Sequence, residues 1–272
     1  MPLTALISDL HSNWPALEAA VSDARERGAR RFVCLGDVIG YGADPCACLD
    51  EVIKLCGESA AYGGLEPGLC LLGNHESGLL SGGGDFNPHA RLALDWTREQ
   101  INRAGGDRAR SYAYWDFLGG LEPMALEGAT AYAHGSPRDP VREYLLPRDA
   151  RDPEKLAALF AALGEEAPEA RVCFVGHSHV PGVFFEDGRY HRPKDTEGPF
   201  ALAADDGGAR AIVNVGSVGQ PRDGDPRLSY ALWDGVELSF VRLGYDVLDA
   251  QAKIRAVSEL PPYLAERLGM GR

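Results

Sequence analysis

The first third of the chain alternates short, almost wholly apolar stretches with longer segments in which apolar residues recur every three or four positions. The short stretches predict strands at Leu3–Ser8, Arg31–Leu35 and Leu69–Leu72, and the longer segments predict helices at Trp14–Arg27 and Asp44–Lys54. Strands separated by helices in this way favour βαβ units with parallel pairing. The sequence therefore predicts an α/β protein.

The remainder of the chain is richer in strands. Asp234-Gly235 lies between two apolar runs and is typical of a hairpin turn. Gly82–Gly84 interrupts the pattern before a helix that reaches Arg103, and we expect segment 82–104 to pack on the sheet in preference to acting as a lid. Gly198–Gly208 is expected to be the most mobile loop. The other predicted strands are 129–133, 172–175, 180–185, 211–215, 230–233 and 237–241, and the other helices are 153–163, 247–258 and 262–268.

Five polar clusters each follow an apolar stretch. In chain order they are Asp9 with His11, Asp37, Asn74 with His75, His134, and His177 with His179. Open α/β sheets bind their ligands at the carboxyl ends of the strands, where these clusters are expected. Carboxylate, amide and imidazole groups ligate divalent cations, and one carboxylate can bridge two of them. The clusters therefore indicate a two-metal site for phosphoester cleavage.

The clusters occur within recognisable motifs. These are Asp9-Leu10-His11, Gly36-Asp37, Gly73-Asn74-His75-Glu76, His134-Gly135 and Gly176-His177-Ser178-His179. Because it contains these motifs in this order, the chain resembles the calcineurin-like metallophosphoesterase superfamily over most of its length. The resemblance implies a four-layer α/β/β/α sandwich of two mixed sheets flanked by helices. It also implies a single domain over residues 1–272, in which strands and helices from about 210 to 272 complete the second sheet.

The resemblance implies which residues hold two divalent metal ions. Asp9, His11, Asp37 and His179 would surround one ion, and Asp37, Asn74, His134 and His177 would surround the other. Mixed nitrogen and oxygen ligands suit Mn, Fe, Zn, Co or Ni better than Ca or Mg, and the carboxylate and amide ligands favour manganese. The reaction expected is attack by a metal-bridged hydroxide on a phosphoester or phosphoanhydride bond.

His75 follows a ligand but has a different role in the family pattern. There the equivalent histidine faces the substrate and stabilises or protonates the departing oxygen. Glu76 or another acidic group could fix the His75 tautomer and keep the ring protonated. His75 and the bridging Asp37 are therefore the predicted catalytic residues.

The second motif bears on the substrate. Protein Ser/Thr phosphatases of this superfamily have an arginine shortly after the motif aspartate, and Gly36–Gly42 contains none. This departure counts against a protein phosphatase and against the diadenosine tetraphosphatases that share the arginine pattern. A fuller likeness, to a bacterial cytosolic branch labelled phosphodiesterase or diadenosine-tetraphosphatase-like, is carried by Asp9–Asn13, Gly40–Gly42, His134–Arg138 and Asn214–Asp223.

Loop residues could replace the missing arginine. Arg138 and Arg222 follow predicted strands and could bind phosphate, with Arg142 and Arg148 as weaker candidates. Tyr41, or an aromatic such as Phe86, could stack on a base. The expected substrate is a small phosphorylated molecule, of which nucleotides are the favoured class. A protein phosphatase and a non-catalytic scaffold of the same fold are the alternatives.

The composition of the chain limits which partners and which compartment we expect. The 272 residues carry a formal net charge of −13, which disfavours nucleic acid and anionic membranes as partners. The first motif follows Met1 too closely for a signal peptide, and no apolar run reaches membrane-spanning length. Six scattered cysteines are typical of reduced thiols. We therefore expect a cytoplasmic protein.

Overall fold

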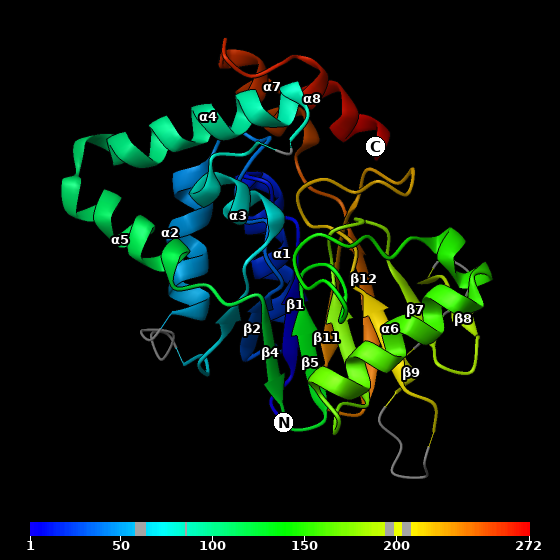
Figure 1. Cartoon of the computed structure of the whole chain (residues 1–272). Coiled ribbons are helices and arrows are strands. Elements are labelled where there is room, and N and C mark those ends of the chain that lie inside the picture. The colour runs from blue at the N-terminus through cyan, green and yellow to red at the C-terminus, as the bar shows by residue number, and fades with distance from the viewer. Residues whose placement is uncertain (58–63, 85, 194–198, 203–207) are drawn as a thin grey trace.

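Two six-stranded mixed sheets lie face to face in the computed structural model, and helices cover their outer faces (Figure 1). The structure describes residues 1–57, 64–84, 86–193, 199–202 and 208–272. The arrangement is the predicted four-layer α/β/β/α sandwich, and the predicted boundaries of most elements agree to within two or three residues.

The first sheet has the strand order β3-β2-β1-β11-β12-β9. Its strands are β1 (Thr4–Ile7), β2 (Arg31–Cys34), β3 (Leu69–Cys70), β9 (Phe200–Ala201), β11 (Leu228–Trp233) and β12 (Glu237–Leu243). β1, β2 and β3 are parallel, as the βαβ pattern predicted, and β11 joins β1 antiparallel. Helices α1 (Trp14–Glu26) and α2 (Pro45–Cys56) cover the outer face; Asn13 caps α1 by accepting a hydrogen bond from the Ala16 backbone N–H at 3.3 Å.

The second sheet has the strand order β4-β5-β6-β10-β7-β8. Its strands are β4 (Met124–Glu127), β5 (Thr130–Ala133), β6 (Val172–Val175), β7 (Gly182–Phe185), β8 (Tyr190–His191) and β10 (Ala211–Asn214). β5, β6 and β10 run parallel, whereas β4 and β7 pair antiparallel with their neighbours. Helix α6 (Pro153–Glu166) covers the outer face through Leu159, Phe160 and Leu163.

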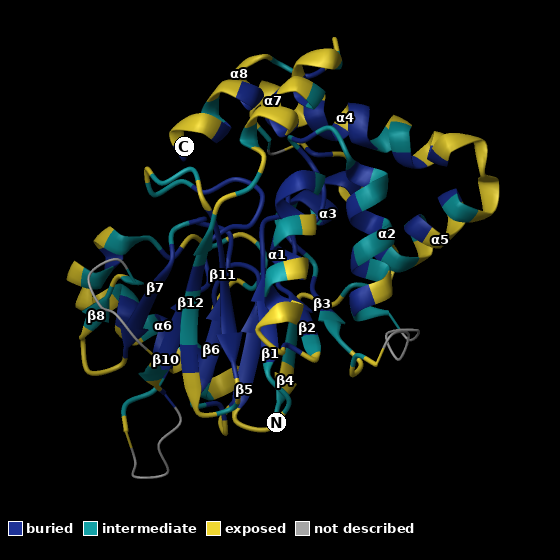
Figure 2. Ribbon diagram, turned by 180° about the vertical axis from the view of Figure 1, so that it is seen from behind, coloured by how far each residue is buried: buried dark blue, intermediate teal, exposed yellow. Residues whose placement is uncertain are grey.

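Alternating residues along each strand fill the spaces between layers. Ala5 and Ile7 of β1 face the helices, and Leu6 between them faces the other sheet. Phe174 and Trp233 meet edge to face between the two sheets, with ring centroids 5.4 Å apart. The inner strands β1, β5, β6, β7, β10 and β11 are accordingly buried throughout, whereas β4, β8, β9 and β12 are mostly half-buried or exposed, as Figure 2 shows.

The C-terminal strands are divided between the sheets. β10 joins the second sheet, but β11 and β12 belong to the first, beside β1. The expectation that the strands from about 210 onward complete the second sheet is therefore wrong for β11 and β12. Apolar alternation identifies a strand but does not identify its pairing partner, which depends on contacts far away in the sequence.

Several elements lie over the strand ends. Helices α3 (Asn74–Ser81) and α5 (Arg108–Gly119) were not predicted, because α3 is short and contains Gly78, and α5 buries few apolar residues.

The predicted helix after the glycine break is α4 (Pro88–Arg103), which contacts α2, α3 and α5. Its Ala93 and Trp96 also pack against the C-terminal helices α7 (Val247–Ala256) and α8 (Tyr263–Glu266), which a 3₁₀ turn, η5 (Arg267–Met270), follows. α4 thus packs mainly on other helices, not on the sheet as expected.

Two remaining expectations concern segment 198–208 and the membrane. Most of Gly198–Gly208, the expected mobile loop, lies outside the described residues. Across the part of the chain that is described, each helix falls short of the length and apolar character that a bilayer crossing requires.

Candidate metal centre and active site

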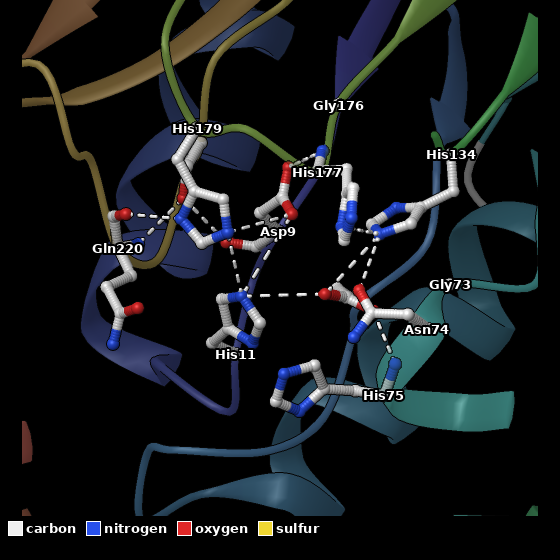
Figure 3. A network of polar contacts seen from close by, with 12 residues as sticks. Asp9, His11, Gly73, Asn74, His75, His134, Gly176, His177, His179 and Gln220 are labelled. Carbon is white, nitrogen blue, oxygen red and sulfur yellow. Dashed lines mark hydrogen bonds and ion pairs between the residues drawn. The ribbon is translucent and has the colours of Figure 1, made fainter. Parts of the chain in front are cut away.

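Each of the five predicted motifs begins where a strand ends. Asp9 and His11 follow β1, Asp37 follows β2, Asn74 and His75 follow β3 at the start of α3, His134 follows β5, and His177 follows β6. Because both sheets direct these strand ends to one edge, residues up to 170 positions apart in the chain, such as Asp9 and His179, become neighbours (Figure 3). The structure thus brings all seven predicted ligands together.

The backbone at this edge is strained. Asp9, His11, Asp37, His177 and His179 all adopt left-handed conformations, with φ between 47° and 62°. A non-glycine residue in this region costs on the order of 1–3 kcal/mol and persists where the surroundings impose it. Here the two motif loops hold each other: the Asp9 N–H donates to the Gly36 carbonyl at 3.0 Å, and the His11 N–H donates to the Asp37 carbonyl at 2.9 Å. Such strain is typical of a functional site.

Four imidazole rings converge on the site, and one nitrogen of each lies against a backbone carbonyl. These pairs are His11 Nδ1 with Ile39 O at 3.2 Å, His134 Nδ1 with Leu35 O at 2.9 Å, His179 Nδ1 with Gln220 O at 2.5 Å, and His177 Nε2 with Arg142 O at 3.0 Å. A carbonyl only accepts, so the ring must donate an N–H to it. The other nitrogen of a neutral ring then presents a lone pair to the centre, as in metal-binding histidines.

The side chains form two groups that share one carboxylate. Asp9, His11, Asp37 and His179 make up one group, and Asp37, His134 and His177 make up the other. The Oδ2 atom of Asp37 lies 3.7 Å from His11 Nε2 and 3.5 Å from His134 Nε2. Asn74 Oδ1 joins the second group at 3.1 Å from His134 Nε2. These are the groupings that the resemblance implied, with Asp37 between them.

The contacts within the groups fit a cation. His11 Nε2 and His179 Nε2 are 3.2 Å apart, and His134 Nε2 and His177 Nδ1 are 3.1 Å apart, so acceptor atoms face each other. Among the described residues, the buried Asp9 Oδ1 has no hydrogen-bond partner. Converging lone pairs repel unless a proton or a metal ion lies between them. The residues therefore suit divalent cations with nitrogen and oxygen ligands.

Charge in the cluster also favours cations. Burial opposes ionisation of Asp37, yet the nearby His134 lowers its pKa well below the usual range, and His179 likewise lowers the pKa of Asp9. Burial lowers the pKa of His177 to about 3, whereas Asp37 outweighs burial and raises the pKa of His134 to about 9. Because a metal-ligating imidazole must be neutral, a bound cation would displace the His134 proton and take over the balance of the carboxylate charges.

Glu76 has a structural task that the sequence did not reveal. It is fully buried, and its carboxyl group accepts hydrogen bonds from the backbone N–H groups of Asp37 at 2.9 Å, Ile39 at 3.2 Å and Gly73 at 3.1 Å. Glu76 therefore fixes the two motif loops against each other. The hypothesis that it orients and protonates His75 is not supported, because its oxygens are engaged by the backbone.

His75 lines the cavity in an aromatic setting. Its ring centroid lies 4.6 Å from that of Tyr41 and 5.0 Å from that of Phe86. Its Nδ1 atom is buried without a hydrogen-bond partner among the described residues, and Gly40 approaches so closely that a Cβ there would overlap it. Burial lowers the pKa of His75 to about 4, so the ring is neutral at physiological pH.

A cavity of about 220 Å³ opens above both groups. It is lined by the candidate substrate contacts Tyr41, Phe86, Arg142 and Arg222, together with Tyr144. The Tyr144 ring stacks on His177 with centroids 3.8 Å apart. Sequence reasoning missed Tyr144 because it lies in an irregular loop that carries no periodic signal.

Arg138, the other predicted phosphate ligand, is not among the residues that line the cavity. Its Nε donates to Glu143 Oε2 at 3.1 Å, and a second contact completes a paired salt bridge. The guanidinium already has a carboxylate partner, so the structure does not support a phosphate-binding role for Arg138.

The sandwich and its buried cluster of aspartate and histidine define a metal-dependent phosphoric ester hydrolase. More particularly, the chain belongs to the calcineurin-like phosphoesterases, because the model of that family matches residues 3–181. The family acts with divalent metals, and the two groups described above are able to bind them.

Similar proteins extend the match beyond the family model. The chain is 33% identical over 277 residues to the uncharacterized protein MJ0912 of Methanocaldococcus jannaschii, covering 99% of this chain and 98% of that protein. It is 34% identical to a metallophosphoesterase from Sphaerobacter thermophilus, whose crystal structure aligns with a TM-score of 0.79 over 100% of this chain and 99% of that one. The hypothetical protein PH1004 from Pyrococcus horikoshii OT3, at 17% identity and a TM-score of 0.72 over 100% and 99% of the two chains, shares the fold.

Proposed function

We propose that this enzyme hydrolyses phosphoester or phosphoanhydride bonds of small, nucleotide-type substrates at a centre of two divalent cations. The observation that carries the proposal is the pair of ligand groups that share Asp37 beneath the cavity. The first group would hold one cation, and Asp37, Asn74, His134 and His177 would hold the other. When bound, the cations supply Lewis acidity and a water nucleophile that is active near neutral pH. The carboxylate and amide ligands suit manganese.

The residues of the cavity wall provide the remaining functions. His75 would contact the leaving oxygen, since its ring lines the cavity beside Asp37 and Asn74. Arg142 and Arg222 would bind the phosphoryl oxygens, replacing the arginine that the second motif lacks. Tyr41, Phe86 and Tyr144 would contact an aromatic base.

The size of the cavity favours a small substrate over a phosphoprotein. A volume of about 220 Å³ with aromatic walls suits a nucleotide fragment, and the second motif contributes Tyr41 where protein phosphatases have arginine. We also place the enzyme in the cytoplasm. All six cysteines are free thiols, and four of them are buried, as expected in a reducing compartment.

Metal analysis combined with a substrate panel tests the proposal. The panel contains bis-p-nitrophenyl phosphate, p-nitrophenyl phosphate, cyclic nucleotides, dinucleoside polyphosphates and a phosphopeptide, each with Mn²⁺. We expect two metal ions per chain and a preference for a nucleotide substrate. Preference for the phosphopeptide would favour a protein phosphatase, and fully metallated protein without turnover of any compound would favour a binding scaffold.

A further inference from the structure

A second cavity adjoins the cavity above the metal centre, on the side of the C-terminal helices. It measures about 550 Å³ and shares Tyr41, Asn87, Tyr144 and Arg222 with the first, so the two cavities meet at these side chains and are treated together as one cleft. α8 and the turn after it supply its outer wall, and Figure 1 shows α8 beside one end of α4. The cleft therefore extends well beyond the space that one phosphoryl group needs.

Arg267 is held in this second cavity between two aromatic rings. Its guanidinium carbon lies 5.7 Å from the ring centre of Tyr41 and 5.4 Å from that of Tyr263. Its Nε donates to the main-chain oxygen of Arg272, the last residue of the sequence, at 2.6 Å, which fixes the side chain at its base. Cation–π contacts and this hydrogen bond orient the guanidinium, so its terminal N–H groups are preorganised for a ligand.

Arg222 and Arg267 bring two positive charges to one cleft in which, among the described residues, no acidic side chain is paired with either. In the portion of the chain that is described, neither has an acidic side chain within 4.0 Å, whereas Arg227 and Arg242 nearby are each paired with an aspartate. The Nε atom of Arg222 is buried and has no hydrogen-bond partner among these residues. Burial, together with the charge of Arg222, lowers the pKa of Arg267. An anion between the two groups would remove their repulsion and supply the missing acceptor.

We propose that the second cavity is a subsite for a second phosphate group, joined to the reacting phosphoryl group by a phosphoanhydride bond. This inference rests on the proposed function and narrows its substrate class to nucleoside diphosphates and longer phosphoanhydrides. Arg222, at the junction of the cavities, contacts both phosphates, and Arg267 contacts the second. In such a substrate the nucleoside beyond the second phosphate contacts Tyr263 and His89, whose rings lie 6.3 Å apart on the outer wall. A nucleoside attached directly to the reacting phosphate instead contacts Tyr41, Phe86 and Tyr144.

Binding of AMP and of α,β-methylene-ADP, measured by calorimetry on the manganese-loaded protein, tests the subsite. The two probes share a nucleoside and differ by one phosphate, and the methylene bridge resists hydrolysis. We expect the wild type to bind the methylene-ADP at least tenfold more tightly. Arg267→Gln should weaken its binding about tenfold to a hundredfold, since one charge-assisted contact is lost, and should leave AMP binding within about threefold of the wild type.

Matched variants separate this effect from folding and net charge. Arg267→Gln keeps a donor near the main-chain oxygen of Arg272, and Arg267→Lys, which keeps the charge, should recover part of the affinity. Arg255→Ala removes the same charge from an exposed position on α7 and should change neither probe. Equal affinities of the wild type for the two probes, or an unchanged preference in Arg267→Gln, would overturn the subsite.

Turnover of bis-p-nitrophenyl phosphate, which carries one phosphate, separates the subsite from the proposed function. We expect Arg267→Gln to hydrolyse it at the wild-type rate. If turnover of this substrate fell as much as the affinity for the methylene-ADP, Arg267 would act at the reacting phosphate and the inference would be overturned. A wild type that hydrolyses no ester would refute the proposed function, while the two binding constants would still decide whether the subsite exists.

Discussion

The metal-binding cluster and the cleft above it contain similar histidine, aromatic and charged side chains but hold them differently. Every predicted aspartate and histidine ligand is at most 4% exposed, and each ligand imidazole is fixed by a backbone carbonyl. In the cleft, Tyr144 is 43% and Tyr263 is 48% exposed. The difference indicates that the cluster is preorganised for cations, whereas these exposed aromatic rings of the cleft can adapt to the substrate.

The largest effect should follow a change in the cluster at the residue that both ligand groups share. Asp37→Asn keeps the shape of the side chain but removes the bridging charge. We expect loss of at least one metal ion and a fall in kcat of about 10³-fold or more, since several kcal/mol of transition-state stabilisation depends on the cations. Metal content by mass spectrometry and turnover measure both. Asp95→Asn, an exposed change on α4, is the control, and full retention of both ions by Asp37→Asn would contradict the shared role.

His75 lies between the two regions, because it borders the cluster but belongs to neither ligand group among the described residues. His75→Asn should lower kcat about 10²-fold to 10³-fold, as expected for removal of a group that acts on the leaving oxygen. Metal content should be nearly unchanged. If the variant lost metal in proportion to activity, His75 would belong to the cluster as a ligand.

A substitution at Gly40 tests whether kcat depends on the position of the His75 ring as well as on its presence. Gly40→Ala would place a methyl group against Nδ1 of His75 and move the ring, so kcat should fall about tenfold to a hundredfold with both metals kept. Gly82→Ala is the matched control, because Gly82 has a similar φ of 93° against 90°, but a methyl group there would meet no described atom within 4 Å. Equal losses in both variants would point to backbone strain instead of ring displacement.

The smallest effect should follow a change confined to the cleft. Tyr144→Leu removes the ring that stacks on His177 and should raise KM for a nucleotide substrate by less than about tenfold, because the ring is partly exposed. Metal content and kcat on bis-p-nitrophenyl phosphate should stay within about twofold. A large loss of metal here would show that the cleft supports the cluster and would end the distinction between the two regions.

The accuracy with which the sequence predicted each region depends on how far apart along the chain its interacting residues lie. The ligands lie in short motifs directly after strands, so their residue types and order were visible without the structure. The cleft brings together Tyr41, Tyr144, Arg222 and Arg267 from four distant segments. Arg222 was predicted from its position after a strand, but the same argument selected Arg138, whose pairing with Glu143 no local pattern revealed.

The sequence by itself determined the α/β class, most helix and strand positions and the identity of the candidate ligands, because hydrophobic periodicity and motif order are local properties of the chain. Only the tertiary structure decided that β11 and β12 join the first sheet, that Glu76 fastens two loops instead of serving His75, and that Arg267 faces the cleft. These outcomes depend on which distant surfaces meet and which polar groups find partners there, and one stretch of sequence does not specify either.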